Sequence, residues 1–167
     1  PHPLFHRERS IDSLDPHHPP KLRSDKSITK IDFTDQLRDY RLGALLGRGT
    51  YSQVRLARNR EGRKFAVKTY LRASLSNEDR RKNLEREVAI LASVQHPCLL
   101  GYQETIETEE SVNIVTELFD SRSLSDYLRS ECLKSLGEEE SRAIMRQLVK
   151  GLVYLHGRDI VHRDLKL

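Results

Sequence analysis

Two oppositely charged residues occupy positions where the surrounding pattern is apolar, and they constrain the fold more than any other feature. Lys68 lies in the strand-like run F-A-V-K-T-Y, and Glu87 shares the apolar stripe of Leu84 and Leu91 on a helix expected over 77–94. A charge on a buried face needs a partner of opposite sign, so we expect Glu87 to meet Lys68. If that pair is well buried, removing one partner would cost roughly 3 to 5 kcal/mol. The alternative is a lysine on the solvent face of an edge strand.

The rest of the pattern predicts an antiparallel sheet accompanied by helices. Alternating apolar and polar residues, with turn residues between them, mark the strands, and capping residues mark the helices. The expected elements are two strands within 40–59, a strand over 63–70, the helix 77–94, two strands within 99–119, a short helix opened by Ser123, and a long helix that starts at Glu138 and stops at Gly157. Because strands and helices do not alternate, this order indicates an α+β fold.

Composition excludes several classes of protein. No apolar run approaches the roughly 20 residues that span a bilayer, so no membrane association is expected. The net charge is +4, but 25 acidic residues are interleaved with the basic ones, which disfavours nucleic-acid binding. Cys98 and Cys132 form no C-x-x-C pair, so a disulfide or zinc site is not expected, and the expected location is cytoplasmic, nuclear or both.

The first 37 residues differ in composition and periodicity from the rest of the chain. They mix Pro, His, Ser and charged residues without a sustained period, which predicts a disordered leader over 1–37. Four histidines in it lack a fixed ligand spacing, so we do not expect a metal site; they are His2, His6, His17 and His18.

A glycine-bearing turn, G-R-G-T-Y-S-Q-V, runs from Gly47 to Val54. Glycines let backbone amides approach phosphate oxygens closely, but a hairpin that only needs glycine dihedral angles would look the same. A Walker A loop or a dinucleotide-binding turn would lead from a strand into a helix. This turn leads from strand to strand, which disfavours both.

The motif H-R-D-L-K at 162–166 completes a set of four in register. With the glycine-bearing turn, A-V-K ending at Lys68, and the helix residue Glu87, it makes residues 38–167 resemble the first part of a eukaryotic protein kinase catalytic domain. Lys166, two positions after Asp164, resembles the serine/threonine class. The resemblance implies a complete small N-lobe over 38–117, consisting of an antiparallel sheet and one helix, and only the first helices of the C-lobe over 118–167.

The resemblance also assigns roles. Lys68, held by Glu87, would bind the α- and β-phosphates of ATP, Asp164 would orient and deprotonate the substrate hydroxyl, and Lys166 would neutralise charge on the transferred group. Thr116 would be the gatekeeper beside the adenine. The further ATP-binding positions implied are Leu46, Gly47, Gly49, Thr50, Tyr51, Ser52, Val54, Ala66, and the backbone of Glu117 and Leu118.

The sequence departs from the family pattern at two points. Ser52 replaces the third glycine of the turn, and its small side chain still permits close backbone approach. The loop asparagine would fall two positions beyond Leu167, and the metal-binding D-F-G aspartate further on, so no metal ligand is expected within the chain. We therefore expect a fragment that is inactive alone.

These features predict a function and its alternative. The expected function is that of a serine/threonine protein kinase fragment, with ATP and Mg²⁺ as cofactors and a protein as substrate. The alternative is a short, non-catalytic module that binds nucleotide or protein partners, for which an exposed apolar face on the 138–156 helix would be a sign.

Overall fold

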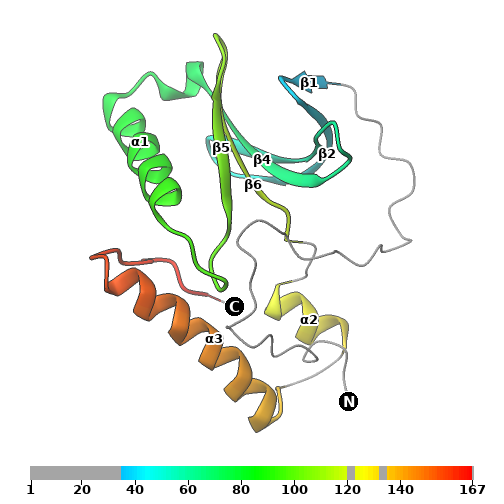
Figure 1. Cartoon of the computed structure of the whole chain (residues 1–167), viewed down its shortest axis with the longest axis vertical. Helices are drawn as coiled ribbons and strands as arrows, with labels where there is room; N and C mark the ends of the chain where they lie inside the picture. Colours follow the sequence, from blue (N-terminus) through cyan, green and yellow to red (C-terminus); the bar gives the residue numbers. More distant parts are fainter. Residues whose placement is uncertain (1–34, 120–122, 132–134, 167) are drawn as a thin grey trace.

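A computed structural model describes residues 35–119, 123–131 and 135–166 of the chain. Within them the chain folds into one six-stranded antiparallel sheet with the strand order β1-β2-β3-β4-β6-β5. The strands are β1 (Asp35–Leu37), β2 (Tyr40–Arg48), β3 (Ser52–Arg58), β4 (Lys64–Leu71), β5 (Tyr102–Glu107) and β6 (Ser111–Glu117). The helices are α1 (Glu78–Ser93), α2 (Leu124–Ser130) and α3 (Glu138–His156), with a 3-10 helix over Arg72–Leu75. The expected α+β class is confirmed, and Figure 1 shows α1 alongside β5 with α2 and α3 below the sheet.

The sheet begins earlier than the sequence indicated. We expected no regular structure before residue 38, yet Asp35–Leu37 form β1, paired with Tyr40–Leu42 of β2. The reversal is tight because Arg38 adopts a positive φ of 50°, and Leu37 is buried in the sheet core. A three-residue strand is too short to show a periodic pattern, which is why it was missed. The remainder of the predicted leader, residues 1–34, lies outside the described residues.

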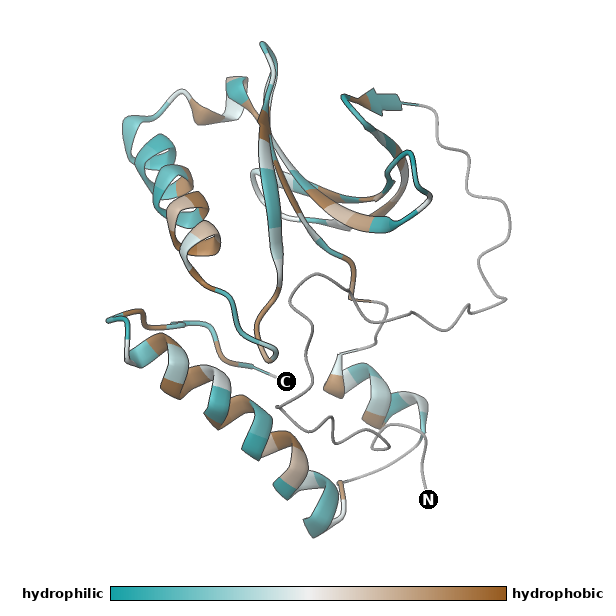
Figure 2. Cartoon of the chain, in the orientation of Figure 1, coloured by the Kyte–Doolittle hydropathy of each residue, from teal (hydrophilic) through white to brown (hydrophobic). Residues whose placement is uncertain are grey.

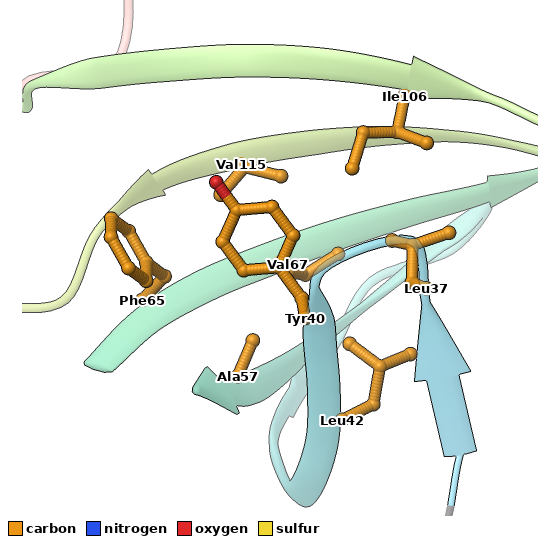
Figure 3. Close-up of a cluster of buried hydrophobic side chains, with 8 residues drawn as sticks. All are labelled: Leu37, Tyr40, Leu42, Ala57, Phe65, Val67, Ile106 and Val115. Atoms are coloured by element: carbon orange, nitrogen blue, oxygen red, sulfur yellow. The ribbon is translucent and has the colours of Figure 1, made fainter. Parts of the chain in front are cut away.

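One face of the curled sheet carries an apolar core (Figure 3). Strand β4 alternates strictly, with Phe65, Val67 and Thr69 buried on this face. Tyr40 packs edge-on against Phe65, with ring centroids 5.3 Å apart. The complete cluster is Leu37, Tyr40, Leu42, Ala57, Phe65, Val67, Ile106 and Val115.

The Tyr40 hydroxyl is a titratable group in this core, and its contacts lead us to predict that the fold is sensitive to alkaline pH. It donates to Glu104 Oε1 at 2.7 Å, and burial, followed by this hydrogen bond, raises the pKa of Tyr40. Because the folded-state pKa exceeds the unfolded value of about 10, the stabilisation is complete below pH 10 and is lost as the pH rises further. We expect Tyr40→Phe to reduce the fall in melting temperature between about pH 9.5 and 11.5. A Tyr40→Phe variant that keeps the wild-type slope would show that this hydroxyl does not cause the alkaline sensitivity.

Helix α1 packs on the other face of the sheet. Its apolar side joins a second cluster of Leu75, Leu84, Val112 and Ile114, with Tyr70, Val88, Leu91 and Tyr102 packed against it. Asn77 caps the helix: its side chain accepts a hydrogen bond from the Asp79 amide. The helix ends at Ser93, shortly before His96 and Pro97.

Helix α3 contacts the segment that connects α1 to β5. The Tyr154 hydroxyl accepts a hydrogen bond from the Gln95 amide at 2.9 Å, and its ring lies 4.9 Å from that of His96. Gly151 is buried against Cys98 and Leu99. These contacts fix where the chain emerges from α3 and therefore where residues 160–166 begin.

Much of α3 is exposed despite its apolar residues, which is the feature named above as a sign of the alternative, non-catalytic module. Met145, Leu148, Val149 and Val153 are between 37% and 66% exposed, and Figure 2 shows hydrophobic residues along the length of the helix. Among the described residues, no helix is both long and apolar enough to cross a bilayer.

Candidate active site

The ion pair expected between Lys68 and Glu87 is present. Lys68 Nζ of β4 donates to Glu87 Oε1 of α1 at 2.8 Å, and the side chains are 36% and 35% exposed. The pair is therefore not well buried, so the cost of roughly 3 to 5 kcal/mol for removing one partner of a buried pair does not apply. A pair this exposed is worth about 1 kcal/mol or less.

The electrostatics at Lys68 favour its charged form. Partial burial disfavours the ammonium, but the hydrogen bond to Glu87 and the proximity of Tyr70 outweigh this, so the pKa of Lys68 lies above its ordinary value. An ammonium that is charged at neutral pH at this position is suited to binding an anion such as a phosphate.

Tyr70 is a site residue that the sequence reasoning missed. It lies two positions after Lys68 on the same strand face, and its hydroxyl donates to Glu87 Oε2 at 2.8 Å. The alternation of β4, which places every second side chain on one face, is the signal that could have found it.

The face around Lys68 gathers several of the predicted nucleotide-binding positions. Residues that pair directly across strands point to the same face of a sheet. Val54 pairs with both Gly47 and Lys68, and Ala66 pairs with Thr116. Strands β2, β3, β4 and β6 thus bring these five residues onto the side of the sheet that Glu87 approaches from α1.

The glycine-bearing turn does not need glycine for its dihedral angles. Among the described glycines only Gly62 has a positive φ, so Gly47 and Gly49 lie outside the left-handed region. The turn closes through the Gly49 amide, which donates to the Ser52 carbonyl at 2.8 Å. A hairpin that requires left-handed glycine geometry therefore does not explain the two glycines. At Gly49 a Cβ atom would crowd the Ser52 hydroxyl at 3.2 Å, whereas at Gly47 a Cβ atom would meet nothing within 4 Å.

The tip of this turn is connected to α1. The guanidinium of Arg80 lies 4.1 Å from the centroid of the Tyr51 ring, and Arg80 Nη2 donates weakly to the Tyr51 hydroxyl at 3.3 Å. Arg80 is itself fixed by a 3.0 Å hydrogen bond from Nη1 to the Ser74 carbonyl. Sequence reasoning missed Arg80, because its position on the helix surface shows no periodic signal.

We expect Arg80→Ala to loosen the turn. A cation–π contact at an exposed site contributes about 0.5 to 1 kcal/mol, so amide hydrogen exchange across residues 48–52 should accelerate by roughly two- to fivefold. Hydrogen exchange followed by mass spectrometry measures this directly. Arg81→Ala, at the next and exposed position of α1, is the control and should leave the turn unchanged. Equal exchange in both variants would show that the contact does not restrain the turn.

The segment after β6 is where the resemblance places the adenine edge. Thr116 is buried, and the Glu117 amide donates to the Gly101 carbonyl at 2.9 Å. Glu117 Oε1 in turn accepts a hydrogen bond from the Gly101 amide at 2.7 Å. Because the Glu117 amide is already engaged, only the carbonyl of Glu117 and the backbone of Leu118 are candidates for a ligand. Leu46, which the resemblance also assigns to the adenine, lies on β2 and is 50% exposed, in contrast to the buried Thr116.

The loop after α3 holds the second group of predicted residues. Lys166 Nζ lies 2.9 Å from Asp164 Oδ2, and both side chains are 73% exposed. This hydrogen bond lowers the pKa of Asp164, so its carboxylate is charged at neutral pH. Arg163 has a positive φ of 64°, an unusual conformation for a residue with a side chain, and the Asp164 amide donates to His162 Nδ1 at 3.3 Å.

The structure shows no direct contact between the loop residues Asp164 and Lys166 and the residues around Lys68. The contacts of Asp164 and Lys166 lie within the loop, whereas those of Lys68 lie between β4 and α1. Within residues 35–119, 123–131 and 135–166, no group of three or more His, Cys, Asp or Glu side chains could hold a metal ion. The described residues thus offer cationic and backbone groups for phosphate but no complete site for Mg²⁺.

Comparison with known proteins gives a consistent result. The family model described as "Protein kinase domain" matches residues 40–167. The SNF1-related protein kinase catalytic subunit alpha KIN12 of Arabidopsis thaliana is 35% identical over 144 residues, covering 86% of this chain and 28% of that protein. The human NUAK family SNF1-like kinase 2 is 35% identical over 122 residues, covering 73% of this chain and 19% of that protein. The chain thus spans less than a third of the length of either relative.

A solved structure is also similar. The crystal structure of Rad53 residues 1–466 in complex with AMP-PNP matches with a TM-score of 0.65 and 28% identity, covering 77% of this chain and 33% of that one. That complex contains an ATP analogue.

Proposed function

The chain belongs to the protein kinase family, and we propose that it contributes the nucleotide-binding lobe and the catalytic aspartate of an enzyme that phosphorylates Ser or Thr hydroxyls of proteins. The observation that carries this proposal is the Lys68–Glu87 ion pair, which presents a charged ammonium on the same sheet face as Gly47 and Val54. Both curated relatives described above are named as kinases, and the similar solved structure contains AMP-PNP.

The proposed nucleotide position follows from the sheet. Leu46, Val54 and Ala66 would contact the adenine, with Thr116 at its inner end and the backbone of Glu117 and Leu118 at its edge. The turn residues that would cover the phosphates are Gly47, Gly49, Thr50, Tyr51 and Ser52. Lys68 would bind the α- and β-phosphates through the protons that it does not donate to Glu87.

The proposed chemistry at the loop is proton transfer and charge neutralisation. The charged carboxylate of Asp164 would orient the substrate hydroxyl and accept its proton as the hydroxyl oxygen attacks the γ-phosphorus and ADP leaves. Lys166, now paired with Asp164, would neutralise charge on the transferred phosphoryl group. The spacing of Lys166 from Asp164 supports Ser and Thr, and not Tyr, as acceptors.

Mg²⁺ supplies further charge neutralisation in this chemistry when it is bound with ATP. The described residues do not provide its ligands, and residues 1–167 contain no D-F-G sequence. We therefore propose that the 167-residue chain binds nucleotide but does not transfer phosphate efficiently without a segment that supplies metal ligands. We also propose a cytoplasmic or nuclear location, supported by the free thiol of Cys98.

A second candidate is a non-catalytic module that binds nucleotide or a protein partner. The exposed apolar side chains of α3, including Met145 and Val153, favour it, because patches of this kind are often covered by other protein surface.

The decisive experiment is phosphate transfer by the native protein. It would be purified from its cells with an antibody against residues 77–94 and incubated with γ-labelled ATP, Mg²⁺ and a mixture of acceptor proteins. Labelled phosphoserine and phosphothreonine are the expected products. Phosphotyrosine as the main product would contradict the proposed class, and nucleotide binding without any transfer would favour the second candidate.

A further inference from the structure

The carboxylate of Glu87 is held through both of its oxygens, and both partners come from β4. Oε1 accepts from Lys68 Nζ at 2.8 Å, and Oε2 accepts from the Tyr70 hydroxyl, also at 2.8 Å. The terminal torsion of a glutamate is soft, so a carboxylate with one partner can still rotate. Two donors on one strand remove that freedom.

Tyr70 is well placed to act as a fixed donor. Its backbone is paired with Ser52 on β3 and with Val112 on β6, and its ring packs against the cluster that includes Leu84. The Lys68 ammonium lies 5.1 Å from the centroid of the same ring, within the range of a cation–π contact. The three side chains therefore form a closed triangle in which each contacts the other two.

We propose that Tyr70 is a positioning residue: its hydroxyl fixes the Glu87 carboxylate, which in turn fixes the Lys68 ammonium for phosphate binding. The phosphate role rests on the function proposed above, whereas the triangle itself does not. Since the hydroxyl can reach Oε2 only while Glu87 faces β4, the bond also favours the orientation of α1 in which the ion pair exists.

The protonation of the triangle suits this role. Burial raises the pKa of Tyr70, so the hydroxyl keeps its proton, and remains a donor, at neutral pH. The groups that set the charge of Lys68 are Glu87 from α1 and Tyr70 from its own strand. Phenylalanine at position 70 would keep the ring in the cluster and remove only the donor.

The test uses the 167-residue chain and three variants, Tyr70→Phe, Glu87→Gln and Tyr102→Phe. Tyr102 is the matched control, because it packs against the same cluster but its hydroxyl bonds to Thr105, away from Glu87. The readout is the rate at which sulfosuccinimidyl acetate acylates Lys68 between pH 7 and 11, followed by peptide mass spectrometry. Only the neutral amine reacts, so the profile reports how strongly Glu87 holds the ammonium.

We expect Tyr70→Phe to shift this profile to lower pH and to raise the rate at pH 8 by about three- to tenfold, the equivalent of one hydrogen bond. Glu87→Gln should produce a larger shift. Adding Tyr70→Phe to it should change the profile much less than in the wild type, because only the direct contact of Tyr70 with Lys68 is then altered. A Tyr70→Phe profile that matches those of wild type and Tyr102→Phe would overturn the proposal. So would a full additional effect in the Glu87→Gln background, because Tyr70 would then act independently of Glu87.

A second measurement separates this inference from the proposed function. The affinity of each variant for a fluorescent ATP analogue should fall by about three- to tenfold in Tyr70→Phe and remain unchanged in Tyr102→Phe. If the wild-type chain binds no nucleotide but the acylation profile still shifts, the positioning role of Tyr70 stands and the proposed function fails.

Discussion

Replacing Asp164 by asparagine in the native protein is expected to reduce phosphate transfer by about 10²- to 10⁴-fold, the usual contribution of a general base. Asparagine has nearly the same shape but cannot accept a proton. Nucleotide affinity should hardly change, because Asp164 lies in the loop after α3 and its contacts are to Lys166 and His162. The measurement is the initial rate of γ-phosphate transfer beside the affinity for an ATP analogue.

The matched control for this change is Asp159→Asn. Asp159 is an exposed aspartate five positions earlier in the same loop, and its positive φ of 58° suits asparagine equally well. We expect this variant to transfer phosphate at the wild-type rate. If Asp164→Asn were also as fast as wild type, Asp164 would not be the base, and the proposed mechanism would be wrong.

The second large effect is expected from Lys68→Ala. The variant loses the cation proposed to bind the α- and β-phosphates, so transfer should fall by about 10²- to 10³-fold. Folding should suffer little: the pair is about one-third exposed, and Glu87 keeps its hydrogen bond from Tyr70. A loss of about 1 kcal/mol or less corresponds to a fall in melting temperature of no more than roughly 4 °C.

Lys82→Ala is the control for the loss of an ion pair in general. Lys82 contacts Glu78 at 2.7 Å on the outer surface of α1, so its removal should affect neither nucleotide binding nor transfer. The two readouts for Lys68→Ala are transfer rate and thermal melting. A variant that loses activity only in proportion to its loss of folded protein would contradict a role for Lys68 in phosphate binding.

The alternation of apolar and polar residues, together with two charges on apolar faces, was enough to predict most of the sheet and helix α1. The period of two in 40–71 and the helical stripe of Leu84 and Leu91 identified most of the sheet and α1, because burying one face of an element leaves a trace in its sequence. The same logic paired Lys68 with Glu87. The roles of these residues in binding ATP, and that of Asp164 in catalysis, stay predictions drawn from the family.

Other features could not be read from the chain. Strand β1 is too short to have a period, and the hydrogen bond from Tyr70 to Glu87 joins two elements through a side chain that the pattern alone would assign to packing. The contact of Arg80 with Tyr51 links a helix surface to a turn. The alternation of β4 could have placed Tyr70 on the face of Lys68, but none of these contacts changes the hydrophobic pattern, so the pattern does not reveal the contacts themselves.

The sequence by itself determined the five strands β2 to β6, the three α-helices and their order, and it predicted that Glu87 on α1 would meet Lys68 on β4. Only the tertiary structure decided how exposed that pair is, that Glu87 has a second donor, and that Gly47 and Gly49 do not need their glycine dihedral freedom. The physical reason is that periodicity records which face of an element is buried. Exposure, donor geometry and backbone angles depend on how separate elements are placed against one another in space.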